Sequence, residues 1–365
     1  MKRSMIKVCG CLLAVFLLLA GSVMGASAAP GAAPGAMPER VYVGGMPFGV
    51  KFYTEGILVV GFCDVDVEAG GRTVNPARDA GLKLRDIIVG INGEAPANAT
   101  ALTAAVEASG GKPIALTVKR APNGTAAKPS DKRGQEPMTI TVQVTPVLSA
   151  SEKRYKTGLW VRDSGAGIGT VTFIVPGSNA FAGLGHGICD GDTGELVAMQ
   201  RGQVTDVTIS GVEKGAVGAP GAIKGYFTPG KTGTLLGNTD CGVFGIFAAL
   251  PPAAGTQMPV GHKQQVHTGP ATVLCTLDDG KIGTYSVNIT SVDAAATGSK
   301  CFTVSVTDPK LIEKTGGIVQ GMSGSPILQD GRIIGAVTHV LINDPTTGYG
   351  IFLDNMLRDM PDLLR

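Results

Sequence analysis

The stretch GGIVQGMSGSPILQDGRIIGAVTH, residues 316–339, decides the fold. It places Ser323 between glycines in a short segment and continues as an apolar run that reaches Asp330-Gly331, after which a second apolar run follows. Asp-Gly between two such runs is a common signal for a tight hairpin turn. The stretch therefore predicts a loop that carries an exposed serine, followed by two antiparallel strands.

The small residues around Ser323 suit a nucleophile. They let the backbone turn sharply, expose the hydroxyl and direct two N–H groups at one point, here those of Gly321 and Ser323, as an oxyanion hole requires. The pattern resembles the nucleophile region of chymotrypsin-like serine peptidases. The alternative is that Ser323 and Ser325 are turn serines that satisfy local backbone groups. Taken alone, the stretch leaves both interpretations open.

A nucleophilic serine needs a base, and the chain has only four histidines. His186 lies in the apolar, glycine-flanked segment FAGLGHGICD, where tight packing would hold an imidazole in one tautomer. The alternative for His186 is a buried histidine that the backbone satisfies. His262 and His267 flank a polar segment and are expected at the surface. His339 follows the second strand after the serine and is the candidate for a substrate-channel residue.

The acid that orients the base is harder to assign. The candidates are Asp190, Asp192, Asp206, Asp240 and Asp308. Asp190 and Asp192 are so close to His186 in sequence that we expect them to cap a turn. Asp240 follows the histidine and precedes an apolar run, where a two-barrel peptidase usually supplies its acid. Asp308 precedes the serine by 15 residues, at the end of a predicted strand.

The second half of the chain, residues 155–365, is predicted to be all-β. Short Val/Ile/Thr-rich runs alternate with glycines, 54 of them in the whole chain, and this spacing indicates a sandwich or barrel. The only helix expected here is C-terminal, at 354–364. The predicted strands are 159–161, 169–175, 203–210, 234–236, 243–247, 271–277, 285–292 and 302–306.

Residues 41–147 are predicted to form a smaller mixed domain. Its expected helices are 76–80 and 99–108, and a solvated loop at 121–137 is expected before the last strand, 138–144. The predicted strands before that loop are 56–60, 87–91 and 114–118.

Within that domain, the stretch PARDAGLKLRDIIVGING, residues 76–93, resembles the core signature of PDZ domains. PDZ domains bind extended peptides by adding a strand to an open sheet edge. The resemblance makes Phe48, Gly49 and Val50 the expected loop that receives a peptide terminus. The alternative is a PDZ fold that only spaces other domains.

Residues 1–28 have the layout of a signal peptide, with basic residues, an apolar run at 11–20 and small residues up to Ala28. Cleavage after Ala28 is expected; the alternative is an uncleaved anchor, because the segment after the basic start is uncharged and nearly long enough to span a bilayer. Either way the remainder is exported. Residues 29–40 are rich in proline, alanine and glycine and are predicted to be a flexible spacer.

Composition excludes several classes of protein. With 44% hydrophobic and 16% charged residues, the chain is neither disordered nor a multi-span membrane protein. Its net charge of +2 falls below zero once the leader is set aside, so nucleic acid is not an expected partner. Five cysteines remain outside the leader, an odd number without metal-ligand spacing, and we expect buried thiols rather than a disulfide framework or a zinc site. They are Cys63, Cys189, Cys241, Cys275 and Cys301.

Three longer segments, 158–173, 184–193 and 307–326, are together similar to the stage IV sporulation protein B (SpoIVB) peptidase family, and the likeness continues through 335–345. The resemblance implies a PDZ domain followed by a chymotrypsin-like double β-barrel. Position by position, it places the family's base on His186, its nucleophile on Ser323 and its acid on Asp308, with Asp240 as the alternative acid. Acyl transfer of this kind needs no metal or organic cofactor.

The resemblance also implies a biological role. Members of the family are exported signalling peptidases of endospore-forming bacteria that act in the space between the forespore membranes. They cleave themselves and then cut a membrane-anchored inhibitor of an intramembrane metallopeptidase, which activates a sigma factor. Two rival functions remain: a catalytically silent PDZ adaptor, and a general extracytoplasmic quality-control protease.

Overall fold

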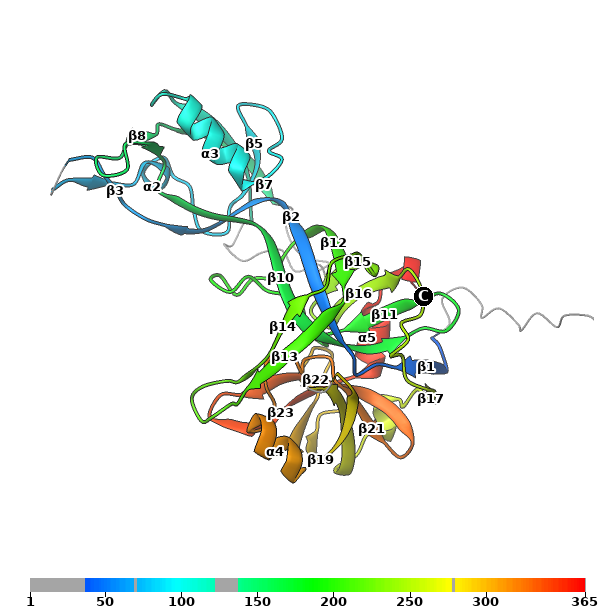
Figure 1. Ribbon diagram of the computed structural model, residues 1–365. Coiled ribbons are helices and arrows are strands. Elements are labelled where there is room, and N and C mark those ends of the chain that lie inside the picture. Colours follow the sequence, from blue (N-terminus) through cyan, green and yellow to red (C-terminus); the bar gives the residue numbers. More distant parts are fainter. Residues whose placement is uncertain (1–36, 69–70, 122–136, 278–279, 365) are drawn as a thin grey trace, which may run out of the picture. The chain divides into compact units, whose positions relative to one another are not determined.

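The computed structural model describes residues 37–68, 71–121, 137–277 and 280–364. The leader, residues 29–36 of the spacer and residues 122–136 of the loop expected at 121–137 lie outside the described residues. No helix within the described ranges is long and apolar enough to cross a membrane. Strands predominate throughout (Figure 1), as the many short Val/Ile/Thr-rich runs predicted.

Six antiparallel strands close a first barrel. Each strand pairs with the next around the barrel, and the last pairs with the first. Its centre contains the rings of Phe48, Phe181 and Phe247, with centroids 5.6 and 4.5 Å apart for successive pairs, a spacing typical of favourable aromatic contacts. In order around the barrel, the strands are β10 (Leu159–Ile174), β11 (Ala180–Gly183), β16 (Gly242–Phe247), β15 (Gly233–Thr239), β12 (Met199–Thr205) and β2 (Pro47–Phe62).

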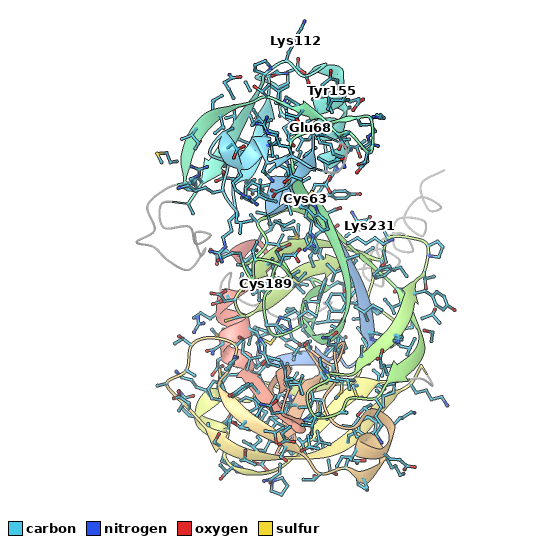
Figure 2. The ribbon with its side chains drawn as sticks, turned by 90° about the vertical axis from the view of Figure 1, so that its left-hand side faces the viewer. Cys63, Glu68, Lys112, Tyr155, Cys189 and Lys231 are labelled. Carbon is cyan, nitrogen blue, oxygen red and sulfur yellow. The ribbon has the colours of Figure 1, made fainter. Side chains whose placement is uncertain are left out.

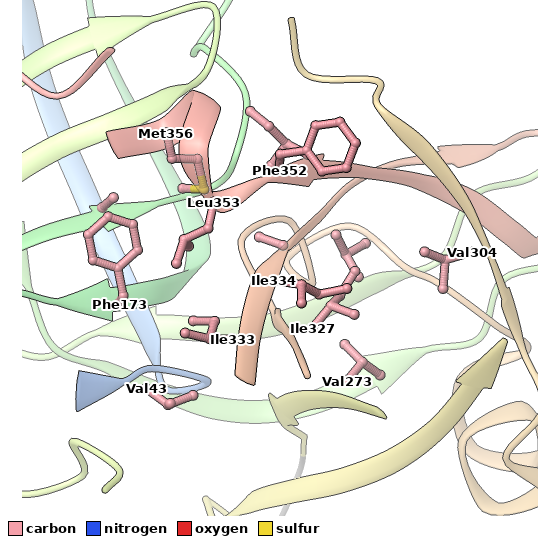
Figure 3. Close-up of a cluster of buried hydrophobic side chains, with 14 of the residues drawn as sticks. Val43, Phe173, Val273, Val304, Ile327, Ile333, Ile334, Phe352, Leu353 and Met356 are labelled. Atoms are coloured by element: carbon pink, nitrogen blue, oxygen red, sulfur yellow. The ribbon is translucent and has the colours of Figure 1, made fainter. Parts of the chain in front are cut away.

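A second closed barrel follows along the chain. Figure 3 shows part of its core, where Val273, Val304 and Ile327 lie buried. The predicted turn at Asp330-Gly331 is confirmed, with both residues left-handed at φ 50° and 72°, as a two-residue hairpin turn of this kind requires. Its strands are β18 (Gly269–Thr276), β19 (Ile282–Val292), β20 (Phe302–Val306), β23 (Asp344–Phe352), β22 (Arg332–Leu341) and β21 (Pro326–Gln329).

The remaining elements of the two-barrel part are short. The helix α4 (Pro309–Thr315) was not predicted, although its signals are present: Asp308 caps it, proline begins it and the left-handed Gly316 ends it. Seven residues are too few for a periodic apolar stripe to be recognised. The others are β1 (Arg40–Val43), β13 (Val207–Glu213), β14 (Ala222–Phe227), β17 (Gln257–Pro259), η1 (Lys263–Gln265), α5 (Leu353–Asp359) and η2 (Asp362–Leu364).

One apolar cluster joins the two barrels. Val43 and Phe173 from the first-barrel side share it with Ile333 of β22 and Met356 of α5 (Figure 3). All four are at most 2% exposed. Because each barrel completes the other's core, the predicted chymotrypsin-like double barrel is confirmed as one packed body.

Residues 55–163, here called the inserted unit, have a core of their own. That core includes Val59, Ile88, Leu102 and Leu116. The predicted helices are confirmed as α2 (Pro76–Asp79) and α3 (Ala99–Ala108). The other elements of the inserted unit are β3 (Val65–Asp66), β4 (Thr73–Val74), β5 (Ile87–Ile91), β6 (Ile114–Arg120), β7 (Met138–Val144), β8 (Val147–Leu148) and β9 (Tyr155–Lys156). Its identity as a PDZ domain stays a prediction.

The arrangement of the domains differs from the expected one, in which a separate N-terminal domain begins near Val41. Residues 41–54 were expected in the N-terminal domain, but β1 and the first half of β2 pair with strands of the first barrel. The strands β2 and β10 are each 16 residues long and continue from that barrel into the inserted unit. The smaller unit is therefore an insertion between two strands of the first barrel, and does not precede that barrel.

The expected peptide-receiving loop at Phe48, Gly49 and Val50 is also wrong, because these residues belong to the first barrel. Phe48 and Val50 are each 2% exposed and belong to the first-barrel core. A Cβ on Gly49 would lie 2.4 Å from the Phe227 ring, so no peptide terminus has access there. These residues form a buried barrel strand because their alternating apolar side chains face the barrel interior.

Candidate active site

Ser323 lies in the loop between α4 and β21, in a backbone conformation that only glycine neighbours allow. Gly321 and Gly324 are left-handed, at φ 96° and 93°. A Cβ on Gly324 would lie 2.0 Å from the carbonyl oxygen of Thr170, closer than any side chain can approach. The N–H of Gly324 donates to the carbonyl of Val337 at 2.7 Å, which ties the loop to β22.

Two threonines of β10 hold this loop from the first barrel. The N–H of Thr170 donates to the carbonyl of Ser323 at 3.0 Å. The Thr170 hydroxyl donates to the carbonyl of Gly321, and the Thr172 hydroxyl to that of Gly324, both at 2.8 Å. Sequence reasoning missed both threonines. The available signal was a pair of alternating hydroxyls in the otherwise apolar second half of β10, since buried hydroxyls need partners.

Two backbone amides of the loop remain available. The N–H groups of Met322, Gly324 and Ser325 all donate to backbone carbonyls. Those of Gly321 and Ser323 donate to no acceptor among the described residues. These are the two amides predicted to stabilise an oxyanion, and their assignment to that role stays a prediction.

The two loop serines differ. The hydroxyl of Ser323 donates to the carbonyl of Thr338 at 2.8 Å, so its proton is not directed at a histidine in this arrangement. The hydroxyl has to leave the Thr338 carbonyl before it can donate to another acceptor. The hydroxyl of Ser325 is fully buried and has no partner within the described part of the chain, so it does not satisfy a local backbone group.

His186 follows β11 in a strained turn. Leu184 and Gly185 are both left-handed, at φ 63° and 68°, and a bulky residue such as leucine seldom adopts that conformation. A Cβ on Gly185 would lie 2.9 Å from the Thr338 side chain. The turn carries the imidazole of His186 to that of His339 on β22, with ring centroids 4.9 Å apart.

The hydrogen bond of His186 fixes its tautomer. Nδ1 lies 2.9 Å from the carbonyl oxygen of Gly187. Since a carbonyl only accepts, Nδ1 carries the hydrogen and Nε2 is left as the basic nitrogen. Burial lowers the pKa of His186, while the bond to the Gly187 carbonyl opposes that shift. The ring is therefore neutral at neutral pH, which is the form a general base requires.

His339 shares this environment. Burial, together with the charges of His186 and Lys300, lowers the pKa of His339 to about 4. Its Nδ1 is buried without a hydrogen-bond partner among the described residues. The assignment of His339 to the substrate channel stays a prediction. His262 and His267 are more than half exposed, as expected for surface residues.

The structure makes Asp308 a helix cap. Its carboxylate accepts hydrogen bonds from the N–H groups of Ser286, Lys310 and Leu311, at 3.2, 3.0 and 3.1 Å. Burial would raise the pKa of Asp308, but these hydrogen bonds and the Lys310 charge lower it overall. No carboxylate contacts His186 within the described ranges. Asp240 lies in the turn between β15 and β16.

The segment after His186 is organised as predicted. Asp190, 3% exposed, accepts from the N–H groups of Asp192 and Thr193 at 3.1 and 2.9 Å and so closes the expected turn. Arg162 forms ion pairs with both aspartates. Beyond the turn, Asn238 brackets Ile188: its Oδ1 accepts from the Ile188 N–H at 2.8 Å and its Nδ2 donates to the Ile188 carbonyl at 3.0 Å.

The cysteines divide into two groups. Cys241, Cys275 and Cys301 are buried, as expected for apolar thiols. Cys63 and Cys189, both labelled in Figure 2, are exposed instead. No disulfide joins any two of the five within the described ranges. Burial is the main cause that raises the pKa of Cys275, to about 12, so that group is inert at neutral pH.

Two antiparallel barrels that share a core, with a glycine-bracketed serine bonded to both barrels and a histidine whose ring lies beside His339 of the second, define a serine endopeptidase of chymotrypsin-like fold. The chain belongs to the SpoIVB peptidase family S55. The model of that family matches residues 153–357, more than half of the chain.

Solved structures to which the chain shows similarity include the Rv3671c protease from M. tuberculosis and the HtrA-type protease AlgW with a tripeptide. The active form of Rv3671c is 15% identical, with a TM-score of 0.32, and the match covers 54% of this chain and 74% of that chain. AlgW is 14% identical, with a TM-score of 0.32, and the match covers 53% of this chain and 54% of that chain. No curated protein matches.

Proposed function

We propose that this serine endopeptidase is exported, cleaves itself and then cuts a membrane-associated regulatory protein in an intercompartmental sporulation signalling pathway. Its substrate would be a membrane-anchored inhibitor of an intramembrane metallopeptidase, and its compartment the space between the forespore membranes. Membership of the SpoIVB peptidase family supports this role. The observation that carries the chemistry is the loop of Ser323, whose glycine geometry leaves two amides without acceptors in the described residues.

The proposed reaction is acyl transfer. Nε2 of His186 takes the proton of the Ser323 hydroxyl, and Oγ attacks the peptide carbonyl. The amides of Gly321 and Ser323 then hold the oxyanion, a stabilisation worth about 3 kcal/mol for each donor. His186 gives its proton to the leaving amine as the C–N bond breaks. Water repeats the sequence on the acyl-enzyme and releases the new carboxyl end.

The inserted unit is proposed to bind peptides and to deliver a partner segment, or a segment of this chain, to the active site. Its binding edge is not at residues 48–50, which are buried in the barrel. The start of β10 is an alternative edge. Leu159 to Arg162 pair with β2 on one side only among the described residues, and Trp160 is 63% exposed there. An unpaired strand edge of this kind can accept an added strand.

The test is intact-mass spectrometry of the full chain at neutral pH over several hours. We expect defined fragments from the wild type and none from Ser323→Ala or His186→Ala. Ser325→Ala is the matched control, because its hydroxyl lies two residues away, has no partner in the described residues and should be dispensable. Intact wild type would favour the silent adaptor, and broad digestion of added casein would favour a quality-control protease.

A further inference from the structure

We propose that Lys300 and Tyr349 form a subsite for an acidic side chain of the substrate, close to the scissile bond. The proposal rests on the serine-peptidase mechanism proposed above and names the class of peptide that this site prefers. Both residues lie next to His339, whose ring lies beside that of His186.

Tyr349 shares one face of the second barrel with His339. Strands β22 and β23 are antiparallel and pair these two residues directly, and directly opposed residues present their side chains on the same face of a sheet. Both are half-buried. The ring of His339 in turn lies 4.9 Å from that of His186, measured between centroids. The surface next to the base therefore continues from His186 over His339 to Tyr349.

The backbone on either side of Lys300 is fixed to the same two strands. The carbonyl of Ser299 accepts a hydrogen bond from the hydroxyl of Thr338 at 2.8 Å. The N–H of Cys301 donates to the carbonyl of Gly350, also at 2.8 Å. Thr338 belongs to β22 and Gly350 to β23, so both strands hold the segment that carries this lysine.

The loop between β19 and β20, which ends at this segment, is braced by the helix α5. The side-chain amide of Asn355 donates to the carbonyls of Ala296 and Gly298, at 3.2 and 3.1 Å. The guanidinium of Arg358 donates to the carbonyl of Thr297 at 2.8 Å. Hydrogen bonds within the protein therefore set the position of the lysine backbone before a substrate is present.

The ammonium group of Lys300 lies over the ring of Tyr349. Its Nζ is 5.2 Å from the ring centroid, a distance typical of a cation–π contact. The charge of Lys300 also acts on His339, where it contributes to the lowered pKa of that imidazole. The cation is therefore close to both side chains of the strand pair.

The polar groups of this surface have no acidic partner within the described ranges. Lys300 is exposed and forms no ion pair there. The acid of the same loop, Asp293, accepts from the N–H of Ala295 at 3.0 Å. The hydroxyl of Tyr349 has no hydrogen-bond partner in the described residues, and Nδ1 of His339 is buried without one. An ammonium, a phenol and an imidazole N–H are groups that donate to a carboxylate.

An acidic side chain also suits the reaction. When Nε2 of His186 takes the proton of Ser323, a positive charge forms beside His339, in a region that already holds the Lys300 cation. A substrate carboxylate offsets that charge in the transition state as well as in the bound state. A basic side chain in the same place would add to it, so the subsite should also discriminate against lysine and arginine.

The test begins with a synthetic peptide library, which the full chain digests at neutral pH. Mass spectrometry of the products shows at which position near the scissile bond aspartate and glutamate are most enriched. One cleaved sequence is then made with glutamate, glutamine or lysine at that position. Pairs of these peptides compete in one mixture, so the ratio of their kcat/KM values does not depend on the amount of active enzyme.

The wild type should prefer the glutamate peptide over the glutamine peptide by about fivefold, as expected of a partly exposed charge pair, and should cleave the lysine peptide most slowly. Lys300→Met should bring the glutamate and glutamine rates together, and Lys300→Glu should reverse the order. Tyr349→Phe should reduce the preference. High salt should weaken it in the wild type, because salt screens exposed charges.

Lys231→Glu is the matched control. Lys231 is exposed and immediately precedes β15, whose other end, at Thr239, lies against the segment of His186: a Cβ on Gly187 would be 2.7 Å from the Thr239 carbonyl oxygen. This variant has the same change of charge far from the proposed subsite and should keep the wild-type ratios. Circular dichroism checks that every variant is folded.

The outcomes separate this proposal from the function on which it rests. A fluorescent fluorophosphonate, in which Oγ of Ser323 displaces fluoride from phosphorus and His186 takes the proton, reports whether the nucleophile is active. If the wild type is neither labelled nor able to cut any peptide, the peptidase mechanism fails and the subsite falls with it. If Ser323 is labelled but acidic peptides are not preferred, or if Lys300→Glu keeps the wild-type order, only the subsite is overturned.

Discussion

The hydroxyl of Thr170, on a strand of the first barrel, donates to the carbonyl oxygen of Gly321 in the nucleophile loop at 2.8 Å. Thr170 is 2% exposed, so this bond is shielded from water. A peptide group has one plane, and fixing the carbonyl of one residue fixes the N–H of the next. The first barrel therefore takes part in setting the backbone of a loop that the second barrel supplies.

Thr170→Val should loosen that loop. Valine has nearly the shape of threonine but cannot donate, so the Gly321 carbonyl loses its partner at a cost of about 1–3 kcal/mol. Urea unfolding should show this loss, and fluorophosphonate labelling of Ser323 should slow more than tenfold. Thr208→Val, at an exposed position, is the control and should change neither quantity appreciably. Unchanged labelling in Thr170→Val would mean that the Thr170 hydroxyl does not help to set the loop.

The buried histidine next to the site should make the fold sensitive to acid. The pKa of His339 falls from 6.5 to about 4 in the folded protein. Between these values the unfolded chain binds a proton that the folded chain does not, so the free energy of unfolding should decrease as pH falls from 6.5 towards 4 and level off below. His339→Gln should remove this part of the pH dependence in urea unfolding series.

His267 serves as a control, because its pKa shifts in the opposite direction to that of His339. Its hydrogen bond to the carbonyl of Thr268, and then its contact with Asp330, raise the pKa of His267. Its contribution to stability is present at low pH and is lost as pH rises. His267→Gln should therefore steepen the acid-side loss of stability rather than relieve it. Equal profiles for the two variants would contradict the assignment to His339.

Local signals predicted the nucleophile region well, and non-local pairing explains most of what was missed. The glycines around Ser323 and the turn at Asp330-Gly331 act through their own φ angles, which a sequence records directly. The place of Phe48 depends on β2 pairing with β12, whose residues lie about 150 positions later. No short-range pattern carries that information, so a buried barrel strand was mistaken for an open loop.

The two candidate acids, Asp240 and Asp308, also depend on contacts that a local sequence pattern does not record. Asp308 and Asp240 are both aspartates near predicted strand ends, and sequence alone cannot say which one has a free carboxylate. The three backbone donors around Asp308 come from 286, 310 and 311, and only the last two are local. A Pro at the next position was the available hint that Asp308 begins a helix.

Two aspartates in the turn after His186, Asp190 and Asp192, form ion pairs with the same Arg162, and Asp190 is the buried one. Asp190→Ala should destabilise the protein by about 1–3 kcal/mol, because it leaves two partly buried backbone N–H groups without their acceptor and also removes the partner of Arg162. Asp192→Ala removes an exposed ion pair to the same Arg162 and should cost less than about 1 kcal/mol. Differential scanning calorimetry would compare them. Equal losses would show that Arg162 pairing, and not the buried turn, is what stabilises this segment.

The nucleophile loop depends on Gly324 for space as well as for conformation, and one comparison separates the two. Gly324 and Gly218 are both left-handed, at φ 93° and 81°. Alanine at either position should cost about 1–2 kcal/mol for its backbone conformation. At Gly218 nothing lies within 4 Å of the added Cβ, so Gly218→Ala should show that cost alone and label at the wild-type rate.

At Gly324 the added Cβ would lie 2.0 Å from the Thr170 carbonyl oxygen and 2.4 Å from the N of Leu184, both backbone atoms that cannot move aside cheaply. Gly324→Ala must therefore push the loop away from β10 and from the turn that carries His186. We expect its fluorophosphonate labelling to fall at least a hundredfold while the chain stays folded by circular dichroism. Should Gly324→Ala and Gly218→Ala label alike, contact between the two barrels at this glycine would not be what aligns Ser323 with His186.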